Sequence, residues 1–335
     1  MYNGLINVYK EAGWTSNDVV SKLRGILGQK KIGHTGTLDP DAEGVLVVCA
    51  GNGTKLVETL IDHDKEYIAV CRLGVVTDTQ DMSGKLLEEN DIKITSDEEA
   101  SVSEKNDCIK ISVSDIKKAV KRFKGDYDQI PPMFSALKSG GRKLYELARE
   151  GRKIERSPRR VHIHSISILD TSLLKTEHIF TMEVRCSKGT YIRTLCHDIG
   201  EALGCGAAME HLTRTSVGSF RIEDAKRISD IQTLKDENGL KDFMLPVDEV
   251  FRDLDRIIVS NEALKFLKNG NPLKASQLIS EAPSNEQDAL TDDESYSDGL
   301  RLRVYDEDGV FYGIYKYDAR KEAFVNDIFL YRNEA

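Results

Sequence analysis

The segment GHTGTLDPDAEG, Gly33–Gly44, constrains the fold of this chain most, because it reads as a rigid loop that leads directly into an apolar run. Its glycines allow tight turns, and Pro40 restricts the backbone beside Asp39. The run VLVVCA, Val45–Ala50, follows at once, and such an uninterrupted apolar run predicts a buried central strand. A carboxylate fixed beside a buried strand needs no reorganisation during a reaction, so Asp39 is the first candidate for catalysis.

The residues of this region exclude two ligand sites with a similar pattern, a calcium-binding loop and a phosphate-binding loop. A calcium loop would not carry Pro40 at its second position, and Ala50 stands where a bidentate glutamate belongs. A phosphate-binding loop would end in Gly-Lys-Ser/Thr, and the nearest segment, GNGTK at Gly51–Lys55, lacks that order. A structural turn in which Asp39 caps backbone amides is the remaining alternative, and the local pattern does not distinguish it from a catalytic loop.

Three further segments extend the pattern: KEYIAVCRLGVVTDTQDMSG (Lys65–Gly84), IPPMFSALKSGGRKLYELAREG (Ile130–Gly151) and CSKGTYIRTLCHDIGEALGCGA (Cys186–Ala207). With the Asp39 loop they resemble, in the right order, the TruB-type pseudouridine synthases, over about the first two thirds of the chain. Helix and strand signals are mixed irregularly along the chain, which predicts an α+β fold, and the resemblance implies a mixed, largely antiparallel sheet in residues 1–250. It also implies the conversion of uridine to pseudouridine in the T-arm loop of tRNA, at position 55.

The resemblance implies roles for four side chains. Asp39 would be the essential carboxylate, which attacks the sugar, attacks the base or assists glycal formation. A pair with Arg193 would keep Asp39 ionised and aligned. Tyr67 would lie against the flipped base and serve in the late proton transfer from C5, and Tyr191 would orient the carboxylate and the nucleotide.

Other residues have two interpretations each. By resemblance His34 fills the space that the flipped base leaves, whereas the simpler alternative is a loop histidine bonded to backbone. Leu212 matches a pocket residue near the base, or is an ordinary core leucine. Lys10 and Lys65 are interpreted as phosphate contacts, a description that fits any surface lysine.

The net charge of −9 is unevenly distributed along the chain. The stretches Glu88–Asp107 and Glu281–Asp298 carry net charges of −6 and −7, so the remainder is positive, and both are interpreted as solvated insertions. In contrast, Lys138–Arg160 holds nine bases against three acids. This excess, which includes Arg142 and Lys143, predicts an RNA-binding insertion at about residues 130–160, the alternative being a solvated helix face with internal ion pairs.

Local patterns place the motifs on helices and strands. We expect helices capped by Ser16 and Thr54 and another beginning at Ser114. A helical spacing covers Arg142–Glu150. Strands are expected at Leu5–Tyr9, Val45–Ala50, Glu66–Leu73, Arg160–Leu169 and Glu177–Cys186. Residues 251–335 contain a short helix, Asn261–Lys268, and a hairpin with its turn at Asp308-Gly309, and they resemble a small PUA-like RNA-binding domain.

The implied reaction needs no redox step and no external group, so no cofactor is expected. The six cysteines show neither a CxxC pair nor a zinc-ligand spacing, so we expect free thiols and no metal site. The absence of a signal-peptide pattern and of a membrane-length apolar run predicts a cytoplasmic protein. Without long basic tails, we expect a stand-alone monomer that binds tRNA and needs no guide RNA.

Two other functional classes were weighed. A tRNA-binding folding chaperone in which catalysis is dispensable is compatible with the same motifs, and a variant of Asp39 would separate it from an enzyme. A two-carboxylate glycosidase would need a second acid facing Asp39, and the candidates Asp41 and Glu43 are too close in sequence for that geometry.

Overall fold

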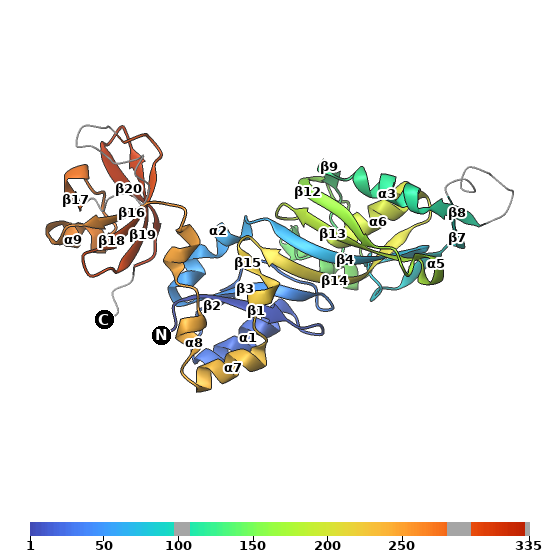
Figure 1. Ribbon diagram of the computed structural model, residues 1–335, viewed down its shortest axis with the longest axis horizontal. Helices are drawn as coiled ribbons and strands as arrows, with labels where there is room; N and C mark the ends of the chain where they lie inside the picture. Colours follow the sequence, from blue (N-terminus) through green and yellow to red (C-terminus); the bar gives the residue numbers. More distant parts are fainter. Residues whose placement is uncertain (97–107, 280–295, 332–335) are drawn as a thin grey trace.

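The computed structural model describes residues 1–96, 108–279 and 296–331, which form two β-sheet units (Figure 1). The nine strands of the larger sheet are β1 (Gly4–Lys10), β2 (Ile32–His34), β3 (Glu43–Ala50), β4 (Lys65–Leu73), β9 (Gly125–Gln129), β12 (Arg159–Asp170), β13 (Ile179–Cys186), β14 (Ala207–Val217) and β15 (Phe220–Arg221). Their order is β1-β3-β14-β4-β13-β12-β9, with β2 beside β3 and β15 beside β14. Among the described strands of this sheet, only β14 and β3 pair in parallel, so the predicted α+β class with a mixed, largely antiparallel sheet is confirmed.

Strand β3 is buried on both faces, which explains its continuous apolar sequence. Its even-numbered side chains from Leu46 to Ala50 pack in one core with helix α1 (Ser16–Leu27). Its odd-numbered side chains from Val45 to Cys49 pack in a second core with helix α2 (Val57–Ile61). The strand therefore holds the Asp39 loop, which directly precedes it, between two packed layers.

Strand β4 alternates in burial along its length, because one face of this part of the sheet lies on a single core. Its buried side chains, including Tyr67, Ala69 and Cys71, share that core with residues of helices α3 (Val113–Lys121) and α6 (Ile192–Leu203). Both helices lie beside β12 and β13 in Figure 1. This packing brings the first turn of α6 close to β4, the strand that carries Tyr67.

Several helix ends differ from the sequence prediction. Thr15, not Ser16, is the N-cap of α1, because its hydroxyl accepts from Asp18 in a capping box. Ser112, not Ser114, caps α3 through the same motif with Asp115. Thr54 caps no helix: its hydroxyl donates to the Gly51 carbonyl within a 3-10 helix, η1 (Gly51–Leu56).

Three strand or helix boundaries also change. Glu177, where a strand was expected to begin, is instead the last residue of a short helix, α5 (Leu174–Glu177), so β13 begins at Ile179. The expected helix at Arg142–Glu150 begins only after a two-residue strand. The acidic stretch from Glu88 begins as strand, not loop, because β6 (Leu86–Glu89) pairs with β5 (Val75–Thr77) and β7 (Ile92–Thr95) pairs with β8 (Ile109–Ser112). Residues 97–107 of that stretch lie outside the described residues.

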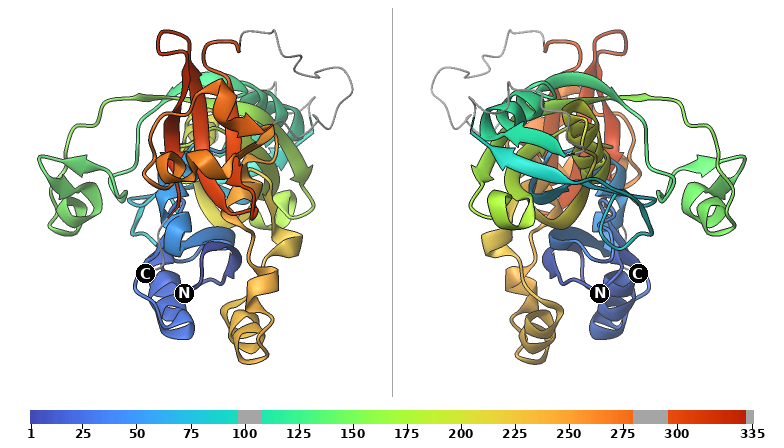
Figure 2. Two further views of the ribbon diagram at one scale, coloured as in Figure 1. Left: turned by 90° about the vertical axis from the view of Figure 1, so that its left-hand side faces the viewer. Right: turned by 90° about the vertical axis from the view of Figure 1, so that its right-hand side faces the viewer.

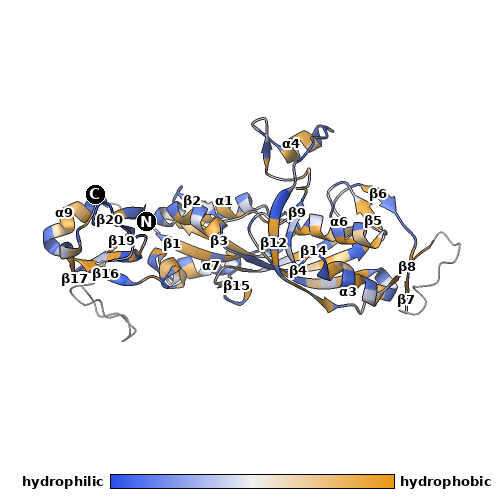
Figure 3. Cartoon of the chain, turned by 90° about the horizontal axis from the view of Figure 1, so that it is seen from above, coloured by the Kyte–Doolittle hydropathy of each residue, from blue (hydrophilic) through white to orange (hydrophobic). Residues whose placement is uncertain are grey.

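An arm projects from the main body between β9 and β12. It consists of a small hairpin, β10 (Lys138–Ser139) and β11 (Arg142–Lys143), followed by helix α4 (Leu144–Arg149). Figures 2 and 3 show the arm standing clear of the sheet. The arm lies within the basic segment of the sequence, and one of its charges, Arg142, forms an ion pair with Glu150.

The C-terminal unit is a separate five-stranded sheet with its own core. Its strands, in the order β17-β16-β18-β19-β20, are β16 (Arg256–Val259), β17 (Leu278–Ile279), β18 (Arg301–Asp306), β19 (Phe311–Asp318) and β20 (Ala323–Phe329). The predicted hairpin with a turn at Asp308-Gly309 is confirmed, and Gly309 has the positive φ of 78° that favours glycine. The predicted short helix is present as η4 (Asn261–Ala263) followed by α9 (Leu264–Lys268). Residues 280–295, which hold most of the second acidic stretch, lie outside the described residues.

The C-terminal unit contacts the larger one directly. Ile314 and Leu330 pack in the same core as the odd-numbered side chains of β3. In addition, Lys55 Nζ donates to the Phe329 carbonyl at 2.7 Å. The linking segment contains α7 (Ile228–Asp236), α8 (Leu240–Phe243) and the 3-10 helices η2 (Ile222–Asp224) and η3 (Val247–Phe251); η5 (Ala275–Gln277) follows within the C-terminal unit.

Gly44, the last residue of the Asp39 loop, tests this packing. Its φ is 103°, and a Cβ there would lie 2.2 Å from the Arg214 carbonyl oxygen of the paired strand β14. We therefore expect Gly44→Ala to lower the thermal unfolding midpoint of the full chain by about 5 °C or more. Gly25→Ala is the matched control, because Gly25 lies inside α1 with nothing within 4 Å of its added Cβ, so its midpoint should not fall. Equal midpoints for the two variants would contradict this account of Gly44.

Candidate active site

Asp39 lies on the loop between β2 and β3, opposite the first turn of α6. Arg193 Nε is 2.9 Å from Asp39 Oδ2, and Arg193 Nη2 donates to Asp39 Oδ1 at 3.2 Å. This two-pronged geometry fixes the carboxylate in position and orientation. The Asp39 side chain remains 36% exposed while that of Arg193 is only 6% exposed, so a ligand can reach the carboxylate but not its partner.

The Arg193 guanidinium also joins the Asp39 loop to two other segments. Its Nη1 donates to the Thr79 carbonyl at 3.0 Å, and its Nη2 donates to the Phe134 carbonyl at 2.8 Å. The Asp81 carboxylate lies 3.5 Å from Nη1. Thr79, Asp81 and Phe134 were not predicted as site residues, although all three lie in the segments that carry the family resemblance. No spacing in the sequence indicated that one arginine would gather them.

The predicted Asp39–Arg193 pair is present, but it does not hold the pKa of Asp39 low. Burial raises the pKa of the Asp39 carboxyl above its ordinary value, and this effect exceeds the opposing attraction of Arg193. The negative charge of Asp81 raises the Asp39 pKa further. Arg193 thus acts in the predicted direction, but desolvation outweighs the ion pair, and the role of Arg193 in keeping Asp39 ionised stays a prediction.

Tyr67 and Leu212 lie on neighbouring strands, β4 and β14, and share one core with Leu38 of the Asp39 loop. Burial raises the pKa of the Tyr67 hydroxyl, which interacts with the guanidinium of Arg214. The structure thus brings both predicted residues to the inner side of the Asp39 loop. The phenol is protonated at neutral pH, since its pKa lies above the ordinary tyrosine value.

Arg214 is the main residue that the sequence interpretation missed. It is 2% exposed, and its Nε donates to the Val45 carbonyl at 2.7 Å while its Nη2 donates to the Gly36 carbonyl at 3.2 Å. These bonds fasten the two ends of the Asp39 loop to β14. The available signal was an arginine two positions after Leu212, which in a strand places both side chains on one face.

His34, at the end of β2, is held by its own loop. Its Nδ1 accepts from the Gly36 amide at 3.3 Å, which leaves the neutral ring's proton on Nε2. Burial and the positive charge of Arg214 lower the pKa of His34, so the ring is neutral at physiological pH. The backbone bond of the simpler interpretation is therefore present, and it also fixes a flat, uncharged ring at this position.

Lys10 and Lys65 do not fit their expected role as phosphate contacts. Lys10 is fully buried, and its ammonium donates to the carbonyls of Glu11, Trp14 and Pro40 at 3.1, 2.7 and 2.9 Å. Lys65 is 7% exposed and donates to two carbonyls of the turn before β4. Burial lowers the pKa of each lysine to about 8. Both ammonium groups are bonded to backbone carbonyls within the protein, and Lys10 has no exposed surface for a phosphate contact.

The remaining predicted residues lie in two places. Tyr191 immediately precedes α6 and is electrostatically coupled to Asp39, whose charge raises the pKa of the Tyr191 hydroxyl in addition to burial. Arg142 and Lys143 lie on the projecting arm, with Lys143 Nζ 5.4 Å from the centre of the Tyr145 ring. Among the described residues no group of side chains could hold a metal ion, and no helix is long and apolar enough to cross a membrane.

Comparison with known proteins places this geometry in a family. Residues 24–100 and 92–192 match the TruB family pseudouridylate synthase (N terminal domain), and residues 193–252 match the tRNA pseudouridylate synthase B C-terminal domain. The chain is 48% identical over 326 residues to tRNA pseudouridine synthase B of Lachnoclostridium phytofermentans, covering 96% of this chain and 97% of that protein. This chain belongs to the TruB family. It is also 40% identical over 306 residues to tRNA pseudouridine synthase B of Clostridium tetani, covering 91% and 93%.

Solved structures share the fold of this TruB family member. A chain in the structure of an H/ACA RNP bound to a substrate RNA containing 2'-deoxyuridine matches with a TM-score of 0.65 and 21% identity, covering 99% of this chain and 86% of that one. A chain of a Cbf5-Nop10-Gar1 complex matches with a TM-score of 0.64 and 23% identity, covering 98% and 85%. At these identities the likeness shows the fold alone.

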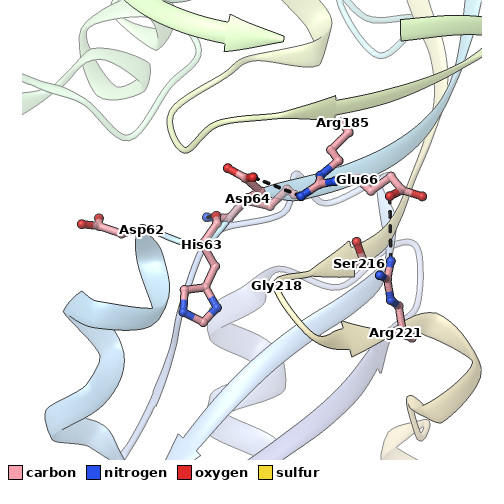
Figure 4. Close-up of a pocket in the computed structure, with 9 residues that line it drawn as sticks. Asp62, His63, Asp64, Glu66, Arg185, Ser216, Gly218 and Arg221 are labelled. Atoms are coloured by element: carbon pink, nitrogen blue, oxygen red, sulfur yellow. Dashed lines mark hydrogen bonds and ion pairs between the residues drawn. The ribbon is translucent and has the colours of Figure 1, made fainter. Parts of the chain in front are cut away.

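A polar pocket of about 410 Å³ lies away from the Asp39 group of this TruB chain (Figure 4). It is lined in part by Glu66, whose side chain points to the sheet face opposite that of the adjacent Tyr67. Its charges neutralise one another, since Arg185 pairs with Asp64 at 3.5 Å and Arg221 pairs with Glu66 at 3.8 Å. The pocket is therefore distinct from the Asp39–Arg193 site.

The electrostatics of this TruB site can be tested by titration. Because the charge of Asp81 raises the pKa of Asp39, Asp81→Asn should lower it. The midpoint is measurable by carboxyl ¹³C NMR of aspartate-labelled protein, with Asp39→Asn assigning the signal. Asp236→Asn on the exposed part of α7 is the control and should leave the midpoint unchanged. An Asp39 midpoint that rises or stays constant in Asp81→Asn would overturn the assignment of Asp81.

Proposed function

We propose that this chain converts uridine to pseudouridine at position 55, in the T-arm loop of tRNA, with Asp39 as the reacting carboxylate. The observation that carries the proposal is the Asp39–Arg193 pair, which holds an accessible carboxylate in one orientation at the centre of the TruB motifs. Relatives named tRNA pseudouridine synthase B support tRNA as the substrate. The T-arm position follows from the family resemblance.

The reaction is an isomerisation with a closed atom balance. The C1′–N1 bond breaks, the base turns over, and C1′ bonds to C5, while C5 loses a proton and N1 gains one. Attack on the sugar, attack on the base and assisted glycal formation each require an ionised carboxylate. Because the Asp39 pKa is raised, the rate should be low under acidic conditions and should rise with pH as Asp39 ionises.

The target base must leave the stacked loop, at a cost of a few kcal/mol. The neutral ring of His34 would occupy the space that the base leaves, and Tyr67 with Leu212 would form an apolar wall against the flipped base. Tyr191 would orient the nucleotide beside Asp39. For Tyr67 to accept the C5 proton, its hydroxyl must first release its own proton. Burial raises the pKa of Tyr67 and opposes that release, so the first role of Tyr67 in this proposal is its ring contact with the base.

The RNA-facing surface is proposed to include the projecting arm, where Arg142 and Lys143 attract phosphate. We propose that residues 1–250 form the catalytic domain, with the arm as its RNA-binding insertion, and that residues 251–335 form a PUA-like RNA-binding domain. The protein would act as a stand-alone monomer in the cytoplasm, without a guide RNA. The positive excess of the arm and the independent C-terminal sheet support this arrangement.

A T-arm stem-loop carrying tritium at C5 of the target uridine tests the reaction, since turnover releases that tritium. We expect Asp39→Asn to reduce release by at least about a thousandfold, because the variant keeps the shape but loses the charge. Its affinity for the stem-loop should change little. Asp41→Asn, two residues away on the same loop and exposed, is the matched control and should remain active.

Substantial turnover by Asp39→Asn would remove this residue from the reaction. If the unaltered protein released no tritium yet accelerated the folding of tRNA, the chaperone alternative would replace the enzymatic proposal. Modification without added metal, cofactor or guide RNA would support the stand-alone form.

The arm makes a second prediction, about salt dependence. Replacing Arg142, Lys143, Arg152 and Lys153 with glutamine should weaken tRNA binding and make the plot of log affinity against log salt less steep. Each lost phosphate contact reduces the slope by roughly 0.7 to 0.9.

The control for the arm variant removes the same number of charges elsewhere. Lys117, Lys121, Arg122 and Lys124 are exposed residues in and directly after α3, outside the arm. Their replacement with glutamine should change the slope much less. An arm variant with the slope of the unaltered protein would place the RNA on another surface.

A further inference from the structure

Gln129, the last residue of β9, is bonded to the backbone of the residue that precedes helix α6. Its side chain is buried, with 1% exposed. Its Oε1 accepts from the Tyr191 amide at 2.8 Å, and its Nε2 donates to the Tyr191 carbonyl at 2.9 Å. Nε2 also bonds to the Tyr127 hydroxyl. The amide group therefore uses both its acceptor and its donors on this small group of partners.

The chemistry of this contact requires an amide. Tyr191 presents one donor and one acceptor, as a residue on the edge of a sheet does, and an uncharged primary amide can satisfy both. A carboxylate could accept from the Tyr191 N–H but could not donate to its carbonyl. Tyr191 is moreover the N-cap of α6: its side chain makes no capping bond, its carbonyl also accepts the first bond of the helix from the Leu195 amide at 3.1 Å, and the Gln129 amide is an additional partner of the same peptide groups.

Tyr191, whose backbone Gln129 binds, lies two positions before Arg193. The segment that follows Gln129 contacts the Arg193 guanidinium directly, because the Phe134 carbonyl accepts from Arg193 Nη2 at 2.8 Å. Between Tyr191 and Arg193 the chain enters the first turn of α6, so a shift of the Tyr191 peptide would be transmitted directly to the arginine that orients Asp39.

We infer that Gln129 is a positioning residue for the reaction: its amide fixes the Tyr191 peptide, and thereby the direction from which Arg193 meets Asp39. Gln129 itself touches neither Asp39 nor Arg193 in the described contacts, so it acts through the start of α6. The inference rests on the proposed isomerisation, because the reaction is what reports the geometry of the pair.

Gln129→Glu turns this inference into a pH-dependent measurement. At about pH 8 the introduced carboxylate cannot donate to the Tyr191 carbonyl, and a displacement of about 1 Å at the site can lower the single-turnover rate as much as a hundredfold. At about pH 5.5 the buried carboxyl is largely protonated and regains a donor, so the rate relative to the unaltered protein should recover at least about fivefold.

The ratio of the two rates is the quantity to follow, because other groups titrate as well. Asp39 has a raised pKa, and Asp198, which influences Tyr127, has a pKa raised to about 6. Both are present in the variant and in the unaltered protein, so their effects largely cancel in the ratio. Tyr127 and Tyr191 are the titratable residues in direct contact with the Gln129 side chain, and neither ionises in this pH range.

Two further variants separate positioning from folding. Gln129→Met has a similar size but no polar group, so its rate should be low at both pH values and its ratio should not recover. Gln232→Glu, on a half-buried glutamine of α7 far from the contact, should match the unaltered protein throughout. Thermal midpoints at each pH establish that every variant is folded during the assay, and Gln129→Met carries the test alone if the glutamate variant does not fold.

The inference is overturned if Gln129→Glu has the rate of the unaltered protein at about pH 8, or if its low ratio does not recover on acidification. It is also overturned if a folded Gln129→Met turns over normally, or if the variants lose only RNA affinity with an unchanged maximal rate. Failure of the unaltered protein to release tritium would be a different result, since it would contradict the proposed function itself.

Discussion

The ion pair between Asp39 and Arg193 organises the rest of this structure. Its carboxylate comes from the loop before β3 and its guanidinium from the start of α6, so the pair exists only when two distant parts of the main unit are correctly packed. The same guanidinium is held on its other side, because it donates to the carbonyls of Thr79 and Phe134 and lies 3.5 Å from the Asp81 carboxylate. A single side chain thus joins the Asp39 loop, the segment after β5 and the base of the arm.

Two more cations, Arg214 and Lys10, are buried around this pair, and each is bonded to backbone carbonyls. Arg214 holds the ends of the Asp39 loop, while Lys10 bonds to the Pro40 carbonyl directly after Asp39. Such cations attract the carboxylate, yet the burial that places them there also raises the Asp39 pKa. Holding a carboxylate in place and keeping it charged are therefore opposed demands, and an exposed edge of Asp39 is left where RNA can enter.

The positive charges of the protein fall into two groups: buried ones that hold the backbone in place, and exposed ones on the arm. The overall charge of −9 does not describe the arm, which stands clear of the sheet and carries the basic segment. The buried lysines that resembled phosphate contacts in the sequence contribute to loop packing instead. In the proposed function, exposed residues such as Arg142 attract the phosphate backbone, whereas buried ones such as Arg193 align the Asp39 carboxylate.

The sequence alone determined the features that depend on neighbouring residues: the rigid Asp39 loop, the doubly buried strand after it and the C-terminal hairpin. Its family motifs also indicated Arg193 as a partner of Asp39. It did not reveal Arg214 or Gln129, because the backbone groups that they bind near the site lie more than sixty positions away, and backbone partners leave no residue-type signal. It misplaced Lys10 and Lys65, since a lysine is identical in sequence whether its ammonium faces water or three carbonyls. Only the tertiary structure decided burial, and burial decides both the direction of the Asp39 pKa and which cations an RNA can reach.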